Sequence, residues 1–567
     1  MSKNNDPGKF YLGLCMAGAV SAGAYTAGVI DYLLEALEKW EVKKTAQKNG
    51  EEQGIPGHHV EVPVIGGASA GGMTSVITAA SLNHPHTPVN EPDPDNPLAD
   101  IPGNILYHSW VDLTGEDMFT QMLGVSDIKS ADVKSGLNSE FIKKVAERVI
   151  MEPTKDWRKP PAYFSNTLKV FTTLTNLQGF EYDVAFNADT TTKHNPYYME
   201  IHNDFACFEM TDKSIEGPNK GWMPLNFPNR VNIDIAMNAA MATGAFPVGL
   251  VSRELSRDPM YVNHNPWLEV TEHNPVCKKK PYVSLNVDGG MLNNEPFDKV
   301  RELIDQITGM TDETGNQDYT KFKSTVVMIA PFPSSKPAII SKSEKLLHVI
   351  GLTLSAMISQ MRAKPDEFKQ ALEKKCAGQF LIAPSRINNS IDKSGKPIQG
   401  EKAIACGALG GFSGFLSKKF RVHDFFLGRH NCKIFLRDYF TIPGDALKEN
   451  PIFSQGYEGC DTSKFKSQID NSYQIIPLFE EPAFFDFPAF KLSPDGNWPV
   501  LEKKEITKFC WPLMFRIHKL LMNIAELSFW SKIWLWIGSV VLLSRMLAGK
   551  TLDTVEDALE EWKLLKK

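Results

Sequence analysis

The chain has 567 residues, of which 42% are hydrophobic and 23% are charged. This composition is typical of a globular protein with room for more than one hydrophobic core, and it excludes a wholly disordered chain. The formal net charge of −6 gives no general electrostatic basis for binding nucleic acid, which needs a basic face. We therefore expect no nucleic-acid partner.

Cysteines and the N-terminal stretch bear on the compartment. The 8 cysteines stand singly, without the C-x-x-C pairs of a zinc ribbon or the spacing of a disulfide framework. The first ten residues, MSKNNDPGKF, lack the apolar segment of a signal peptide. We expect a cytoplasmic protein with reduced thiols. We expect no metal and no cofactor, because no His, Cys and Asp residues have ligand spacing.

Hydrophobic periodicity predicts strands that alternate with helices. Apolar runs at 10–15 and 62–65 predict strands, and residues 22–40 and 72–82 predict the helices that follow them. Two such units in succession favour a parallel sheet and an α/β fold. Further strands are predicted at 169–174, 198–202, 282–287, 324–329 and 379–382, and further helices at 233–243, 297–307, 343–362 and 366–374.

Other segments predict loops or insertions. Residues 83–103 hold six prolines, which predicts a long irregular loop. The polar, proline-containing ranges 184–230 and 252–281 predict insertions that form a lid or a substrate-binding rim.

The last hundred residues are richer in apolar and aromatic side chains than the rest. In the range 511–548, tryptophans alternate with Lys and Arg, and the uncharged stretch between Lys532 and Arg545 is too short to span a membrane. Two interpretations stay open: helices that lie in a membrane interface, or helices packed against the main domain.

Ser69 is the candidate nucleophile. The sequence Gly67-Ala68-Ser69-Ala70-Gly71 matches the G-x-S-x-G elbow, in which a serine occupies a sharp turn between a strand and a helix. The glycines allow close backbone approach, and the start of the following helix supplies N–H groups where an oxyanion would form.

A second Ser-Ala-Gly triplet, at Ser21, lacks the first glycine of the elbow. Its glycine-rich loop, Gly18 to Gly23, lies between a predicted strand and a predicted helix, where backbone N–H groups are exposed. We assign this loop to oxyanion stabilisation, with Gly18, Ala19, Val20 and Ala70 as the donors. A tight turn with small residues for packing is the alternative.

Asp288 is the candidate partner of Ser69. It ends the alternating strand YVSLNVD and is followed by Gly289 and Gly290, so a carboxylate stands at a strand end where it can act as a general base. A turn-forming Asp-Gly is the alternative. His423 and His430 come late enough in the chain to complete a Ser-Asp-His triad instead.

Four elements in order resemble the patatin-like phospholipases, which use a Ser-Asp dyad. They are the loop GAVSAGAYTAGVIDYL, the elbow GASAG with Ser69, the stretch NAAMATGAFPVGLV, and DGGMLNNEPFD with Asp288. The family's Gly-Gly-Gly-x-Arg-Gly reads Gly18-Ala19-Val20-Ser21-Ala22-Gly23 here, so two glycines and the arginine are missing. A positive φ at a substituted position would be strained.

The resemblance implies a three-layer α/β/α domain with a mainly parallel central sheet, a helical C-terminal extension, and phospholipase A or lysophospholipase activity. We divide the chain into a catalytic domain at 8–335, a helix-rich continuation at 336–450 and a C-terminal extension at 451–567. The expected substrate is a phospholipid or another acyl lipid, at a membrane surface on the inner face of the cell. An inactive membrane-associated scaffold of the same fold and an α/β-hydrolase-type esterase are the alternatives.

The later segment KKFRVHDFFLGRHNCKIFLRDYF resembles one found in some bacterial patatin-like proteins. We interpret its Arg421, Asp424 and Arg429 as ion pairs along a helix, and otherwise as contacts for lipid headgroups.

Overall fold

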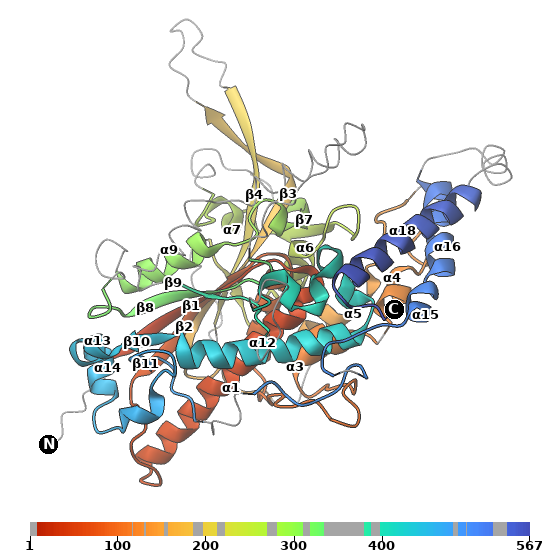
Figure 1. Cartoon of the computed structure of the whole chain (residues 1–567). Helices are drawn as coiled ribbons and strands as arrows, with labels where there is room; N and C mark the ends of the chain where they lie inside the picture. The colour runs from red at the N-terminus through yellow and green to blue at the C-terminus, as the bar shows by residue number, and fades with distance from the viewer. Residues whose placement is uncertain are drawn as a thin grey trace, which may run out of the picture.

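The computed structural model describes residues 8–115, 117–129, 132–151, 157–184, 197–211, 221–268, 281–309, 318–333, 379–386, 397–479, 486–494, 496–524 and 541–566. They form a mixed α/β fold around one large sheet (Figure 1). The strands of this sheet are β1 Lys9–Met16, β2 His59–Gly67, β3 Phe164–Val184, β4 Tyr197–Met210, β5 Met223–Leu225, β6 Arg253–Arg257, β7 Tyr282–Asp288, β8 Ser324–Ile329 and β9 Gln379–Ile382.

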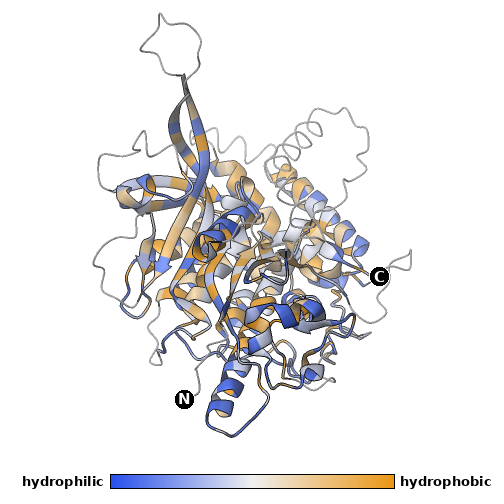
Figure 2. Cartoon of the chain, turned by 90° about the vertical axis from the view of Figure 1, so that its left-hand side faces the viewer, coloured by the Kyte–Doolittle hydropathy of each residue, from blue (hydrophilic) through white to orange (hydrophobic). Residues whose placement is uncertain are grey.

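The sheet is mostly parallel. Its order within the described residues is β5-β4-β3-β2-β1-β8-β9, and β7 joins it by pairing with β3 and β6. The pairs of β1 with β2 and β8, of β2 with β3, of β8 with β9 and of β4 with β5 are parallel. β3 pairs antiparallel with β4 and β7, and β6 pairs antiparallel with β7. The paired ends of β3 and β4 project as an arm from the body of the molecule (Figure 2).

The helices complete the architecture on both faces. The longer ones are α1 Gly23–Lys48, α2 Ser69–Ser81, α6 Ile233–Thr243, α9 Phe297–Thr308, α12 Lys418–Asp438, α16 Cys510–Asn523 and α18 Val541–Glu561. The shorter ones are α3 Ile105–Tyr107, α4 Met118–Met122, α5 Glu140–Ala146, α7 Pro259–Asn263, α13 Gly444–Glu449, α14 Pro451–Gly456 and α15 Lys503–Thr507. Two π-helical turns, His108–Asp112 and Glu147–Met151, follow α3 and α5 and are called the two π-turns below. Near α13 and α14, β10 Thr441–Pro443 pairs with β11 Ser472–Gln474 in a separate sheet.

Strand alternation divides the side chains between two cores. Leu12 and Leu14 of β1 point into the larger core, which also holds α1, α2, α6 and α12. Cys15 points to the other face and joins Val300 and Ile304 of α9. Successive strand residues face opposite sides of the sheet, so both faces carry apolar side chains. Helices cover each face.

α1 and α12 cross closely, although about 400 residues of chain separate them (Figure 1). Two glycines permit the contact: a Cβ on Gly28 would lie 1.9 Å from the Phe425 carbonyl oxygen, and one on Gly428 would lie 2.2 Å from the Tyr25 carbonyl oxygen. The backbone that approaches Gly28 so closely belongs to another helix, α12.

The prediction of ion pairs along α12 is wrong, and so is that of headgroup contacts. The side chains of Arg421, Asp424 and Arg429 are all buried. Arg421 donates to three backbone carbonyls, and Asp424 accepts from the backbone N–H groups of the turn at 405–406. Arg429 pairs with Asp31 and Glu35 of α1. Each group thus binds a different part of the chain, which holds α12 against α1 and against the loops at 111–115 and 405–414.

Most predicted elements are confirmed within a few residues, and 83–103 contains no helix or strand. The prediction that 184–230 is an insertion is wrong where β4 and β5 lie in the central sheet. Phe205 and Cys207 of β4 face one core while Ala206 and Phe208 face the other, as in an inner strand. Likewise 252–281 contains β6 and α7. The predicted helices 343–362 and 366–374 lie outside the described residues.

The C-terminal extension ends in α16 and α18, which pack on each other. Arg516 of α16 is buried and binds Asp127 in two hydrogen bonds of 2.9 Å, which anchors the helix to the loop after α4. Trp511, Phe515 and Leu542 are exposed. Part of the predicted apolar range, 525–540, lies outside the described residues. Among the residues that are described, no helix combines the length and the apolar character needed to cross a membrane.

Candidate active site

β3 brings the two candidate catalytic residues together. Gly67, at the end of β2, pairs with Thr172 of β3, and Asp288, at the end of β7, pairs with Leu174 two residues farther along. β2 runs parallel to β3, and β7 runs antiparallel to it. The turn that follows β2 and the turn that follows β7 therefore lie next to each other on the sheet. Ser69 and Asp288 are 219 positions apart in the chain and are brought together by one shared neighbouring strand.

Ser69 occupies the sharp turn that the elbow motif predicts. Its φ is +49°, in the left-handed region, and it is the first residue of α2. The turn requires glycine on either side: a Cβ on Gly71 would lie 2.1 Å from the Met16 carbonyl oxygen, and one on Gly67 would lie 2.5 Å from the backbone of Gly71. The strained conformation is therefore enforced by close packing against the end of β1.

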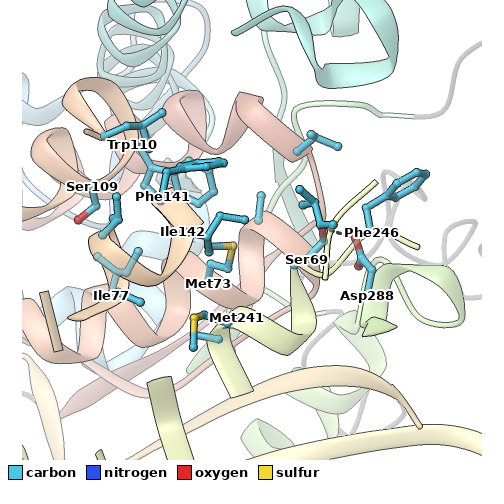
Figure 3. A pocket seen from close by; sticks show the side chains of 18 of the residues that line it. Ser69, Met73, Ile77, Ser109, Trp110, Phe141, Ile142, Met241, Phe246 and Asp288 are labelled. Atoms are coloured by element: carbon cyan, nitrogen blue, oxygen red, sulfur yellow. Dashed lines mark hydrogen bonds between the residues drawn. The ribbon is translucent and has the colours of Figure 1, made fainter. Parts of the chain in front are cut away.

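The two side chains form a hydrogen-bonded pair. The Ser69 hydroxyl donates to Asp288 Oδ2 over 2.8 Å, and the two residues are 6% and 3% exposed. Figure 3 shows them facing each other at one end of a pocket. A carboxylate this close to a serine hydroxyl, and shielded from water, is placed to accept its proton.

Backbone contacts fix the orientation of Asp288. Its other carboxylate oxygen, Oδ1, accepts the Gly290 N–H over 2.7 Å. Its own N–H donates to the Ala245 carbonyl, and its carbonyl accepts the Thr175 hydroxyl. A Cβ on Gly289 would lie 2.1 Å from a backbone oxygen of β3, so glycine is needed here for the close approach of the two chain segments. One carboxylate oxygen is thus held by the backbone, and the other faces Ser69.

The prediction that Gly18 is an oxyanion donor is wrong. Its N–H donates to the Asn294 carbonyl over 3.2 Å and is therefore not available to an oxyanion. The N–H groups of Val20 and Ala70 have no acceptor among the described residues, and both residues line the pocket at Ser69. Val20 has a φ of +49°, the strain expected where the loop carries a larger residue than glycine. Ala19 does not line this pocket.

Ser21 has a structural role. Its hydroxyl donates to the Gly411 carbonyl and accepts the Gly414 N–H over 3.0 Å. The loop after β1 is therefore joined to the turns at 405–415, which lie before α12.

The pocket beside Ser69 is apolar. About 770 Å³ of space free of protein atoms lies between its walls, open solvent at the mouth included. Its walls come from α2, α5, α6, both π-turns and the loop at 244–250. Apart from Ser69, Asp288 and Ser109, the lining residues are apolar or glycine.

The two candidate histidines lie elsewhere. His423 and His430 are buried on α12 against Phe487, and neither lines the pocket. Burial lowers the pKa of His423, although Asp424 counteracts this, and burial lowers the pKa of His430 to about 4. Both rings are therefore neutral at pH 7, and Ser69 is bonded to Asp288 instead.

Sequence reasoning missed two supports of the site. The Thr243 hydroxyl accepts the Ser69 N–H over 2.9 Å, and Asn294 occupies the Gly18 N–H. Thr243 lies in NAAMATGAFPVGLV and Asn294 lies in DGGMLNNEPFD, two segments that resemble the patatin-like family. The resemblance marked the segments but assigned no role to these two residues.

Within the described part of the chain, no group of three or more His, Cys, Asp or Glu residues is arranged to hold a metal ion.

A search with models of known protein families finds no match. "Uncharacterized protein y4iI" of Sinorhizobium fredii is 30% identical over 502 residues, which cover 79% of the chain and 68% of that protein.

Proposed function

The chain belongs to the same family as the Sinorhizobium fredii protein y4iI, and from the geometry of its site we propose that it is a serine lipid acyl hydrolase with a patatin-like fold and a Ser69–Asp288 dyad. The observation that carries the proposal is the 2.8 Å hydrogen bond between a serine on a strained elbow and a buried aspartate, at an apolar pocket. The expected substrates are fatty-acyl esters of membrane lipids, of the phospholipase A or lysophospholipase type.

The reaction follows from the positions of these groups. Asp288 accepts the proton of the Ser69 hydroxyl as Ser69 Oγ attacks the ester carbonyl carbon. The N–H groups of Ala70 and Val20, with the start of α2, stabilise the negative oxygen. Collapse breaks the ester bond, and the alcohol leaves with the proton from Asp288. Water then loses a proton to Asp288 and attacks the acyl-serine, and the fatty acid leaves as Ser69 regains its proton.

The proposal uses no metal and no histidine, since the proton moves between two groups that already share a hydrogen bond. The patatin-like assignment is supported by the Ser-Asp pair and by the glycines at 67, 71 and 289, whose Cβ positions are blocked. A Ser-Asp-His triad is disfavoured by the position of His423 and His430 on α12, away from the pocket.

A membrane-peripheral location at the cytoplasmic face belongs to the same proposal. Trp511 and Phe515 of α16 and Leu542 and Met546 of α18 are exposed, and Lys519 lies over the Phe515 ring. Exposed aromatic and aliphatic side chains with a neighbouring cation suit a lipid interface.

One observation favours a second candidate, a scaffold of the same fold that hydrolyses nothing. The Gly18 N–H is already occupied, and Ala19 and Val20 stand where the family has glycine, so oxyanion binding rests on fewer donors.

The test is reaction with a fluorescent fluorophosphonate, alongside fatty-acid release from phospholipid vesicles. We expect wild type to be labelled, Ser69→Ala to lose labelling and hydrolysis, and Asp288→Asn to lose at least about 10³-fold in hydrolysis. Ser81→Ala, a buried serine at the far end of α2, is the matched control and keeps both activities. A folded wild-type protein that neither labels nor releases fatty acid contradicts the proposal and favours the scaffold.

A further inference from the structure

The pocket extends from Ser69 in one direction. Ser69, Met73 and Ile77 all line it and stand at positions i, i+4 and i+8 of α2, so they share one face of the helix. Eight residues of α-helix rise about 12 Å. Figure 3 shows Ser69 and Asp288 at one end of this row and Ile77 and Ser109 at the other.

The end away from Ser69 is closed by the two π-turns. Ser109 and Trp110 come from the first turn and Ile150 from the second, and all three are buried. Arg148 joins the turns, because its guanidinium donates to the His108 carbonyl over 2.7 Å and to the Leu113 carbonyl over 2.8 Å. Ile77 is only 5% exposed, whereas Met73 and Phe246 near the dyad are half-buried, so the pocket opens on the side of Ser69. π-helical turns occur often at functional sites, which agrees with a role for this wall.

Beyond the dyad the walls offer little to a polar group. The Ser109 hydroxyl is engaged with the Ile105 carbonyl over 2.6 Å, and the other polar side-chain group of the described lining is the buried indole N–H of Trp110, which has no partner among the described residues. A polar ligand would lose most of its hydrogen bonds to water here without replacement. A linear hydrocarbon loses none, and its burial is favourable in proportion to its area.

From these observations, and resting on the proposed function, we infer that the pocket holds one unbranched acyl chain of medium length, with the ester carbonyl at Ser69 and the terminal methyl at Ile77 and the π-turns. The row of about 12 Å matches an octanoyl or decanoyl chain, and a palmitoyl chain is too long for it. Ile77 is the residue that sets the length, because it ends the row on α2.

The inference is tested with p-nitrophenyl butyrate, octanoate, laurate and palmitate. We expect kcat/KM of the wild type to be highest for octanoate and at least about tenfold lower for palmitate. Ile77→Phe shortens the pocket and moves the optimum to butyrate. Ile77→Ala deepens it and moves the optimum to laurate. Ile304→Ala on α9 removes an equally buried isoleucine on the opposite face of the sheet, and it leaves the profile unchanged.

Fluorophosphonate labelling of each variant separates the two proposals. Absence of labelling in the wild type overturns the proposed function and this inference with it. Labelling with a chain-length profile that is flat, or that both Ile77 variants leave unmoved, overturns the inference alone. A change in Ile304→Ala as large as that in Ile77→Ala also overturns it, since the effect would then be one of general packing.

Discussion

At the scale of single residues, the hydrogen bond between Thr243 and Ser69, the proposed nucleophile, can be tested by substitution. The Thr243 hydroxyl is the acceptor for the N–H of Ser69, a residue held at a φ of +49°. Removal of that acceptor leaves a buried donor unpaired, which costs about 1–3 kcal/mol. Nothing else in the described residues accepts this N–H.

We therefore expect Thr243→Val to lower the free energy of unfolding by about 1–3 kcal/mol and to slow fluorophosphonate labelling of Ser69. Thr243→Ser keeps the hydroxyl and restores the labelling rate, which separates a positioning role from general packing. Equal labelling rates in wild type and Thr243→Val would show that the hydrogen bond does not position the nucleophile.

The sequence predicted those candidate catalytic residues that local geometry defines. The elbow at Ser69 and the Asp-Gly-Gly turn at Asp288 each require glycines within a few positions, so their patterns are visible in the sequence. It could not predict that Asn294 takes the Gly18 N–H, because that partner lies 276 residues away and depends on how the turn after Asp288 folds back. Long-range partners of backbone groups leave no local pattern.

At the scale of elements, the crossing of α1 and α12 depends on two positions without a Cβ. A methyl group on Gly28 would overlap the carbonyl of Phe425, and backbone atoms cannot move aside as a flexible side chain can. The crossing also buries Arg429 with its partners Asp31 and Glu35, and a buried charge that loses its partner is strongly destabilising.

We expect Gly28→Ala to lower the free energy of unfolding by about 3 kcal/mol or more, measured by urea denaturation. Gly549→Ala is the matched control, a glycine inside α18 with open space around its Cβ position. This control should stabilise the protein by roughly 0.5–1 kcal/mol, because alanine favours the helix. A Gly28→Ala protein as stable as wild type would contradict the close crossing.

Periodicity predicted elements whose two sides differ, such as α9, and short apolar strands such as β8. It failed where an element is buried on all sides or carries polar side chains inside. α12 contains buried Arg, Asp, His and Lys, whereas its charges had been interpreted as ion pairs along the helix or as headgroup contacts. A strand was predicted at 198–202, but its range was assigned to an insertion, because tertiary packing and not periodicity places β4 in the central sheet.

At the scale of the whole molecule, the larger core contains a buried histidine that makes stability depend on pH. His58 is packed against Trp40 and Phe453, and its Nε2 is bonded to the Ile475 carbonyl over 2.8 Å. Its Nδ1 is buried and has no partner among the described residues. Burial lowers the pKa of His58 to about 3 from an ordinary value of 6.5.

Between those two values the unfolded chain binds a proton that the folded chain does not, so stability falls as the pH falls from 6.5 towards 3. Between about pH 7.5 and 5.5 the loss from this residue is roughly 1.3 kcal/mol. We expect His58→Phe to remove that part of the pH dependence in urea denaturation at the two pH values. His264→Phe, at an exposed histidine, should leave it in place, and an unchanged pH dependence in His58→Phe would contradict the assignment.

The order of strands was less predictable than their existence. β1 to β2 follows the simple parallel rule, but β7 enters the sheet antiparallel beside β3, and β8 lies on the far side of β1. The order and direction of these strands depend on which faces of the sheet the later helices cover. No local sequence pattern carries that information. The meeting of Ser69 and Asp288 was predicted from resemblance, and its cause is the shared neighbour β3.

The crossing of α1 with α12 also has a consequence for synthesis of the chain. Asp31 is made 398 residues before Arg429, its partner in the folded state. At ordinary rates of translation the carboxylate remains without that partner for roughly 20 to 80 s. During this time α1 exposes an apolar face that α12 will cover only later. The N-terminal half therefore completes its fold after the ribosome has passed residue 438, the end of α12.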